Sequence, residues 1–287
     1  LRIVGATGNE RIVFGCGADG YGTQIKGTCE SGTVTNTFEV PIAIPGGTLL
    51  TRVQFQEKTY NIFKKPWSGG DLDVPLEFNG TGGLEFCADS PDFLTPFFFN
   101  EKTPPRPLVV RAPFGLGSPN RMVKIEKDYL SSVHFCGPAG ATAVTNEVPM
   151  HVRSGQAYGY HPNQGLERDD LMFVEDPANV RFVQKGKFSI TPAEYWYFRA
   201  GNYTFLGGIE VLGTKGFKTY PYNGGHFIIA GQPLVATNAP VTFQGTVWDG
   251  AGRETYHFDV AGNLYDELNI HRVDVRCGVA NALNPKA

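Results

Sequence analysis

Apolar and polar residues alternate along many short stretches of the chain, most regularly between residues 241 and 277. Val241, Phe243 and Val247 alternate there with polar residues, and Asp249 begins a glycine-rich break before the alternation resumes at Tyr256. A two-residue period places apolar side chains on one face of an extended strand and polar side chains on the other. Glycine admits the positive φ angles that tight hairpin turns need. The stretch therefore predicts a three-stranded antiparallel meander.

Strands of the same kind are expected along the whole chain, at a spacing of roughly ten residues. Glycine and proline separate them, with 36 glycines and 20 prolines among 287 residues, and residues 48–56 and 60–63 are expected to form a hairpin. No run keeps a helical period for more than about two turns. Such a pattern is typical of β-sandwiches and jelly rolls. The predicted fold is all-β, with two antiparallel β-sandwich (jelly-roll-like) halves and very little helix.

The boundary between these halves is expected in the small, polar segment at residues 137–148. Domain boundaries fall in such segments because few core contacts cross them. The sequence thus predicts an N-terminal β-sandwich over residues 1–140 and a C-terminal β-sandwich over residues 148–287. No long internal repeat relates the two halves to each other.

The charge and hydropathy of the chain argue against two classes of partner. The formal net charge is −3 and no run of lysine and arginine is present, so no nucleic acid is expected as a partner. No apolar run approaches the ~20 residues of a membrane-spanning helix. The chain begins at Leu1 rather than at methionine, which indicates a processed precursor or a trimmed chain from which any signal peptide is gone.

The five cysteines favour an oxidising compartment. None stands in a Cys-x-x-Cys pair, which argues against a zinc or redox site. We expect one disulfide between Cys16 and Cys29, which would close a glycine-rich loop, and a second between Cys87 and Cys136. Cys277 is then free or paired with another chain. The alternative is that all five are reduced, buried and apolar in character.

Two sequons, at Asn79 and Asn202, point to the same compartment. Each has the Asn-x-Thr pattern that accepts N-linked glycans in secreted proteins. Together with the cysteines they predict an extracellular, disulfide-bearing glycoprotein.

Aromatic side chains are the candidate carbohydrate-binding residues. Aromatic residues make up 13% of the chain, and residues 194–204 form a run rich in them. The faces of sugar rings stack on tryptophan and tyrosine, while neighbouring polar groups bind the hydroxyls. Core packing is the alternative for each of these rings. The candidates are Trp67, Trp196, Tyr203 and Trp248.

The segment YFRAGNYT at residues 197–204 resembles the Y-F-K-A-G-x-Y-x motif of jelly-roll alginate lyases, over eight residues. The resemblance implies that Tyr203 acts in proton transfer at C5 of a uronic acid, with Arg199 neutralising the carboxylate and His134 assisting. Such a lyase needs these groups because the C5 proton is weakly acidic until the carboxylate is neutralised.

A weak candidate metal site lies near the end of the chain. Asp259, Asn263 and Asp266, with Glu267 beside them, offer oxygen ligands of the kind that calcium prefers, although the spacing is not that of an EF-hand. The alternative is that these residues only hydrogen-bond the backbone of a turn. No cofactor other than calcium is expected. An acidic run at residues 167–176 could supply the paired carboxylates of a glycoside hydrolase, or could be a solvated loop.

Three functions are compatible with these features. The leading hypothesis is a secreted, non-catalytic protein with a binding or assembly role on a glycan-rich or particle surface, because the sequence contains no nucleophile elbow, phosphate-binding loop or dinucleotide fingerprint. The first alternative is a polysaccharide-degrading enzyme, a lyase before a glycoside hydrolase. The second is a self-assembling coat or filament subunit. The expected partners are therefore carbohydrate or further copies of the chain.

Overall fold

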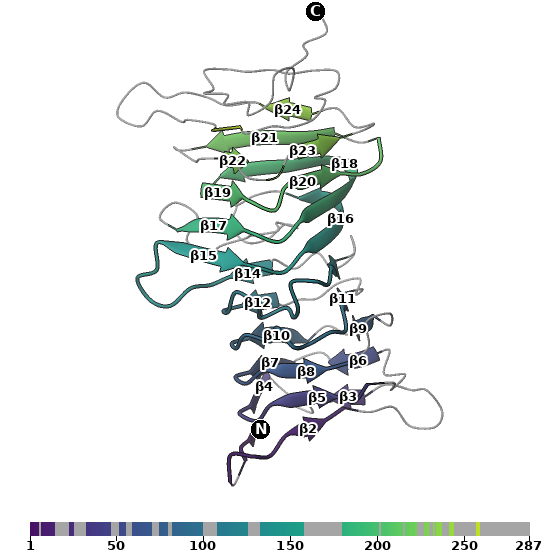
Figure 1. The fold of residues 1–287 in the computed structure, drawn as a ribbon, viewed down its shortest axis with the longest axis vertical. Coiled ribbons are helices and arrows are strands. Elements are labelled where there is room, and N and C mark those ends of the chain that lie inside the picture. Colours follow the sequence, from purple (N-terminus) through teal and green to yellow (C-terminus); the bar gives the residue numbers. More distant parts are fainter. Residues whose placement is uncertain are drawn as a thin grey trace, which may run out of the picture.

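The fold of the chain is known from a computed structural model, drawn in Figure 1. The structure describes residues 1–5, 7–14, 23–25, 33–46, 52–55, 59–70, 75–79, 82–99, 108–125, 133–157, 180–200, 202–214, 216–222, 227–229, 232, 234–236, 241–243 and 257–258.

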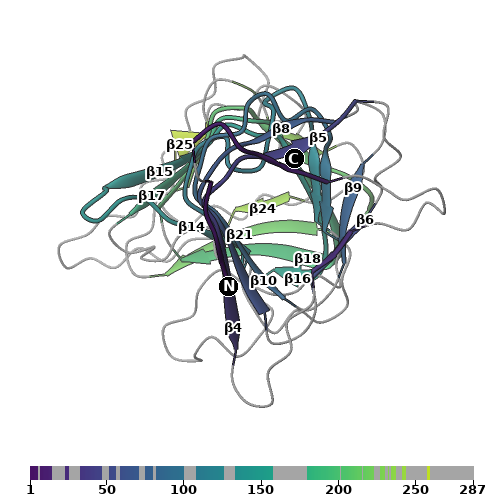
Figure 2. The same ribbon diagram turned by 90° about the horizontal axis from the view of Figure 1, so that it is seen from below.

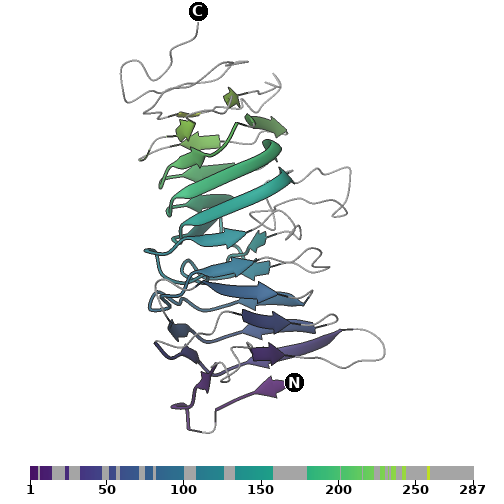
Figure 3. The same ribbon diagram turned by 90° about the vertical axis from the view of Figure 1, so that its right-hand side faces the viewer.

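Strand pairing in the structure is parallel throughout the described residues. Strand β4 (Val34–Phe38), for example, pairs with β7 (Thr59–Phe63), the strand one coil later in the chain. The successive coils stack into a long rod that begins at the N-terminus (Figures 1 and 3). The molecule is therefore all-β with almost no helix, but it is a parallel β-solenoid. The predicted antiparallel β-sandwich halves are wrong.

Four sheets run along the rod in the part of the chain that the structure describes. Sheet A is formed by β1 (Arg2–Ile3), β4, β7, β10 (Gly83–Phe86), β12 (Leu108–Val110) and β14 (Val133–Phe135). Sheet B is formed by β2 (Ile12–Val13), β5 (Ile42–Ile44) and β8 (Trp67–Gly69). Sheet D is formed by β15 (Ala143–Asn146), β17 (Arg181–Gln184), β19 (Asn202–Phe205), β22 (Phe227–Ile229) and β25 (His257–Phe258).

Sheet C is the longest of the four. It is formed by β3 (Thr23–Ile25), β6 (Arg52–Phe55), β9 (Leu76–Asn79), β11 (Phe97–Phe99), β13 (Val123–Ile125), β16 (Met150–Ala157), β18 (Phe188–Ala200), β20 (Ile209–Val211) and β23 (Leu234–Ala236), with β21 (Gly216–Tyr222) beside β18 and β24 (Val241–Phe243) beside β21. The sheets enclose a common interior when the rod is viewed along its axis (Figure 2).

The interior consists of columns of apolar side chains, one residue per coil. In sheet A the parallel register places Phe38, Phe63 and Phe86 above one another, with ring centroids 4.8 Å and 5.4 Å apart. Stacked aromatic rings at such distances add stabilisation beyond the burial of their area. The columns explain why apolar and polar residues alternate along these strands. One face of each strand points into the rod, and the other face lies on its outside.

Buried amide side chains bridge neighbouring coils inside the rod. Asn36 donates a hydrogen bond of 2.9 Å to Asn61 on the adjacent strand. Asn146 donates a hydrogen bond of 2.8 Å to Gln184 in the same way, and both of these residues also bind the carbonyl oxygen of Val148 at a corner of the coil. These bonds satisfy polar groups that burial would otherwise leave without partners.

The predicted local pairings fail for the same reason as the fold class. The expected hairpin over residues 48–63 is absent, because β6 belongs to sheet C and β7 to sheet A. The expected meander near the C-terminus is wrong where it is described: β24 pairs in parallel with β21 and β25 with β22. The predicted boundary segment at residues 137–148 contains β15.

Candidate functional site

Polar side chains lie on the outer face of sheet C, along the two long strands β16 and β18. Apolar residues of these strands point into the rod, and His151 and Arg153 alternate with them on β16. On β18, Thr191 is partly exposed, and Ser189 is in register with His151 but is only 1% exposed. Lys124 of the neighbouring strand β13 is exposed on this face and pairs in register with His151. Residues from three coils therefore meet on one surface.

The strand register places His151, Ser189 and Glu210 in one row across β16, β18 and β20. The Ser189 hydroxyl donates a hydrogen bond of 3.0 Å to Glu210 Oε2, and Lys187 Nζ lies 2.9 Å from the same oxygen. His151 Nε2 shares a hydrogen bond of 3.1 Å with Thr191 Oγ1. We call these five residues, with Lys124 and Arg153, the sheet-C cluster.

The charges of the sheet-C cluster are set by these contacts. The hydrogen bond from Lys187 holds the pKa of Glu210 below its ordinary value, although burial opposes it. Glu210 is therefore a carboxylate at neutral pH. Three cations, Lys124, Arg153 and Lys187, stand against this one carboxylate, so the described cluster has an excess of positive charge even with His151 neutral.

The cluster contains serine, histidine and a carboxylate, but not in the order of a hydrolytic triad. In a triad the imidazole lies between the nucleophile and the carboxylate. Here Ser189 lies between His151 and Glu210, and its hydroxyl proton is directed to the carboxylate. The arrangement offers the Thr191 hydroxyl, an imidazole and cations for binding a polar ligand, whereas Ser189 is buried.

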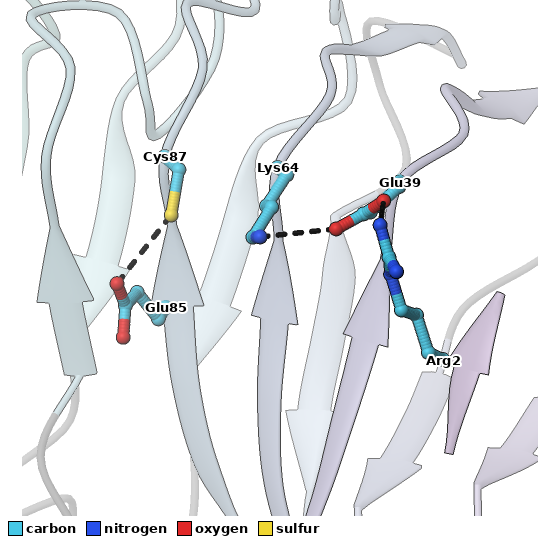
Figure 4. Close-up of polar contacts among 5 residues, drawn as sticks. All are labelled: Arg2, Glu39, Lys64, Glu85 and Cys87. Carbon is cyan, nitrogen blue, oxygen red and sulfur yellow. Dashed lines mark hydrogen bonds and ion pairs between the residues drawn. The ribbon is translucent and has the colours of Figure 1, made fainter. Parts of the chain in front are cut away.

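A second group of polar side chains lies on the outer face of sheet A. The carboxylate of Glu85 accepts a hydrogen bond of 2.6 Å from the Tyr60 hydroxyl and bonds with Arg111 Nε. The Cys87 thiol donates to it over 3.4 Å (Figure 4). Burial raises the pKa of Glu85, but the bonds from Tyr60 and Arg111 outweigh burial and leave the pKa below its ordinary value.

The neighbours of Glu85 are correspondingly poor nucleophiles. Burial and the adjacent carboxylate raise the pKa of Cys87 to about 12 and also raise the pKa of Tyr60. Both groups therefore remain protonated at neutral pH. The group on sheet A links three coils to one another and offers no activated side chain.

Two ion pairs to the carboxylate of Glu39 connect the first coil to the next two coils. Glu39 binds Arg2 with one oxygen and Lys64 Nζ, 3.0 Å away, with the other (Figure 4). The hydrogen bonds from Arg2 and Lys64 lower the pKa of Glu39 to about 2. This row is an attachment of the terminal strand β1 and not a binding pocket.

Two of the four predicted carbohydrate-binding residues are in the core. Trp67 is 1% exposed and its ring packs against those of Phe63, Phe93 and Phe97 at centroid distances of 5.0–5.6 Å. Tyr203 is 3% exposed and belongs to the same apolar core. These rings cannot stack on a sugar. Alternation along a strand does not tell which face is inside, and both rings lie on the inner one.

The three residues that the resemblance assigns to a lyase lie on strands of three different sheets. Arg199 lies on β18 of sheet C, Tyr203 on β19 of sheet D and His134 on β14 of sheet A. Tyr203 points into the core, so it cannot reach a bound sugar. Trp196, a third carbohydrate candidate, lies on β18 in register with Ala157 and Phe217.

The predicted disulfide between Cys87 and Cys136 is not formed, and neither cysteine is disulfide-bonded. They follow β10 and β14, which are separated by β12. Two strand spacings are about 9–10 Å, whereas the Cα atoms of a disulfide are less than about 7 Å apart.

Other predicted sites are only partly covered by the structure. The sequon residue Asn79 ends β9 and Asn202 begins β19. Among the residues that the structure describes, no three His, Cys, Asp or Glu side chains are grouped to hold a metal ion. No helix in that part of the chain has the length and apolar character to cross a membrane. The remaining candidates lie outside the described residues: Cys16, Cys29, Cys277, Trp248, Asp259, Asn263, Asp266 and the acidic run at 167–176.

The residues of the sheet-C cluster were not singled out from the sequence. The signal was present in two short patterns, His151-Val-Arg153 and Ser189-Ile-Thr191, in which polar residues flank a buried one. Such triplets are common in strands, and only the coil register brings these two together.

Comparison of the chain with protein-family models, with curated proteins and with solved structures gave no match. The class of the protein therefore follows from its own structure, which is a parallel β-solenoid with polar clusters on the outer faces of two sheets.

Proposed function

We propose that the protein is a non-catalytic binding protein that holds an extended, acidic glycan on the outer face of sheet C. The observation that carries this proposal is the sheet-C cluster, in which Lys124, Arg153 and His151 lie on adjacent strands beside the partly exposed hydroxyl residue Thr191. Its cations suit carboxylates of uronic acids, and the Thr191 hydroxyl suits the hydroxyls of a sugar.

The shape of the surface supports an extended ligand. Strands in sheet C follow one another at about 4.8 Å, and one polar row crosses β13, β16, β18 and β20 without a change of register. A polymer with regularly repeated polar groups can bind such a ladder at several points. Each contact is weak on an exposed surface, and several together give useful affinity.

Titration of the chain with a panel of polyuronates and neutral glucans tests the proposal. We expect binding to polyuronates, weaker binding at high ionic strength because the contacts are exposed ion pairs, and little binding to neutral polymers. The double variant Lys124→Ala/Arg153→Ala should lose about tenfold in affinity. Lys65→Ala is the matched control, because Lys65 is an exposed cation in the β7–β8 connection. No binding to any acidic polymer, or equal loss in the control, would overturn the proposal.

A polyuronate lyase is the second candidate. It is favoured by one observation, the presence of an imidazole, His151, beside two cations on the same face. A lyase needs a base and positive charge at the carboxylate. Absorbance of the unsaturated product, measured with each polyuronate for the chain and for His151→Ala, separates the two functions. Product that depends on His151 makes the protein a lyase, and binding without product leaves it a binding protein.

We further propose that the protein works outside the cell, where acidic glycans are accessible. The sequons at Asn79 and Asn202 support this location. Expression in a eukaryotic secretory host and treatment with an N-glycosidase should then lower the apparent mass. An unchanged mass would show that neither Asn79 nor Asn202 is glycosylated.

A further inference from the structure

An aromatic side chain lies on the outer face of sheet C, next to the sheet-C cluster. Phe98 is the middle residue of β11, between Phe97 and Phe99, which are both 0% exposed. Side chains of a strand alternate between its two faces, so Phe98 points out of the rod, and it is partly exposed. Its ring is therefore not one of the rings that form the core columns.

The strand register places Phe98 in the same row as the cations of the cluster. Phe98 is in register with Lys124 of β13 on one side and with Glu77 of β9 on the other. Lys124 is in turn in register with His151 of β16. Neighbouring strands are about 4.8 Å apart, so these side chains follow one another closely on one face. From β9 to β16 the row therefore consists of a carboxylate, an aromatic ring, an ammonium group and an imidazole.

A uronic acid carries groups that complement this row. The CH groups of a pyranose ring form an apolar face that stacks on an aromatic ring, and its carboxylate can pair with a cation beside that ring. Lys124 and Arg153 attract the carboxylate, whereas the negative charge of Glu77, on the opposite side of Phe98, repels it. The row thus favours one position and one direction for the sugar ring.

We propose that Phe98 is the stacking platform for one uronate ring of the acidic glycan, with the carboxylate of that ring directed towards Lys124. The inference rests on the function proposed above, and it adds the residue that holds the ring and the direction in which the ring lies. It also supplies the aromatic contact that Trp67 and Tyr203 cannot make, because both are in the core.

Titration of the full chain with hexamers of galacturonate and of mannuronate, at low and at high ionic strength, tests the platform. Phe98→Leu should lower the affinity about fivefold, because it keeps an apolar side chain but removes the flat ring. Phe98→Tyr keeps the ring and should retain the affinity. The loss in Phe98→Leu should be the same at both ionic strengths, since stacking does not depend on net charge. The loss in Lys124→Ala/Arg153→Ala should shrink as salt is added.

Saturation-transfer NMR gives a readout that a purely structural role of Phe98 would not change. Saturation of the aromatic protons of the unmodified chain should reach the CH protons of the bound sugar, and the transfer should be much weaker in Phe98→Leu but not in Phe98→Tyr. Phe114→Leu is the matched control, because it makes the same change at a partly buried phenylalanine in the β12–β13 connection. It should alter neither the affinity nor the transfer, and urea midpoints verify that each variant is folded.

The failure of this proposal is distinguishable from the failure of the proposed function. If the hexamers bind in a manner that depends on Lys124 and Arg153 but equally well to Phe98→Leu, the platform is wrong and the proposed function stands. Equal losses in Phe98→Leu and Phe98→Tyr, or in Phe98→Leu and Phe114→Leu, would also overturn the platform. If neither hexamer binds at either ionic strength, the proposed function and the platform are both wrong.

Discussion

The side-chain amide of Asn36 donates a hydrogen bond of 2.9 Å to the side-chain oxygen of Asn61, one coil further along the rod and inside the core. Asn61 in turn donates to Thr59 Oγ1 over 3.1 Å and to the carbonyl of Gly83 over 3.3 Å. The two amides thus connect three successive coils. Their hydrogen bonds require the observed parallel register, whereas contacts between apolar side chains alone would allow the strands to shift relative to one another.

Replacement of Asn61 by leucine should destabilise the protein by about 1–3 kcal/mol, because the buried amide of Asn36 loses its acceptor. The measurement is the urea midpoint at unchanged m-value. The double variant Asn36→Leu/Asn61→Leu should be more stable than Asn61→Leu, since no unpaired amide remains in this pair. If the double variant were less stable than Asn61→Leu, the role assigned to the Asn36–Asn61 hydrogen bond would be wrong.

Gly186 lies where two coils approach each other closely at a corner. A Cβ atom on Gly186 would lie 2.4 Å from the carbonyl carbon of Val148 and from the nitrogen of Pro149. Because these are backbone atoms, Gly186→Ala should lower the free energy of unfolding by about 1–3 kcal/mol. Gly46→Ala is the control, since the nearest atom to its Cβ is 4.0 Å away. Equal thermal midpoints for the two variants would show that the corner is looser than described.

The attachment of the first coil should depend on pH through Glu39. Its pKa of about 2 lies below the ordinary 4.5, so its ion pairs stabilise the docking of β1 above pH 4.5 and are lost as the pH falls towards 2. The Thr37 amide donates to Leu1 across this contact, and its hydrogen-exchange protection factor should fall over that range. Glu39→Gln should have low protection throughout, while the Cys87 amide, bonded to Phe63, keeps its protection. If the Thr37 amide were as protected in Glu39→Gln as in the unmodified chain, Glu39 would not be what attaches β1.

The thiol of Cys87 should react slowly in the native protein. With a pKa of about 12, about one molecule in ten thousand carries the thiolate at pH 8, and the thiolate is the reactive form. Alkylation by iodoacetamide should be fast only after unfolding, and Glu85→Gln should speed it about tenfold by removing the adjacent charge. A Cys87–Cys136 cross-link in the peptide map of the native protein would contradict this prediction and show that the disulfide forms.

Part of the fold could be predicted from residue patterns alone. The apolar stretches at Phe97–Phe99 and Phe188–Ile190 do form strands, and the expectation of very little helix agrees with the all-β structure of the described residues. The coil was also readable in principle: Phe38 and Phe63 are 25 residues apart, and Phe63 and Phe86 are 23 apart. The spacing was missed because one aromatic residue per coil is a weak signal when the intervening loops differ in length and composition.

The amino-acid sequence by itself determined that the chain forms short strands with one apolar and one polar face, because the side chains of a strand alternate whatever its neighbours are. Only the tertiary structure decided which strands pair, in which direction, and which face is inside. Main-chain hydrogen bonds are the same for every sequence, so pairing is selected by contacts between distant residues, such as Phe38 with Phe63 and Asn36 with Asn61. That selection placed Trp67 and Tyr203 in the core and brought His151, Ser189 and Glu210 into one row across sheet C.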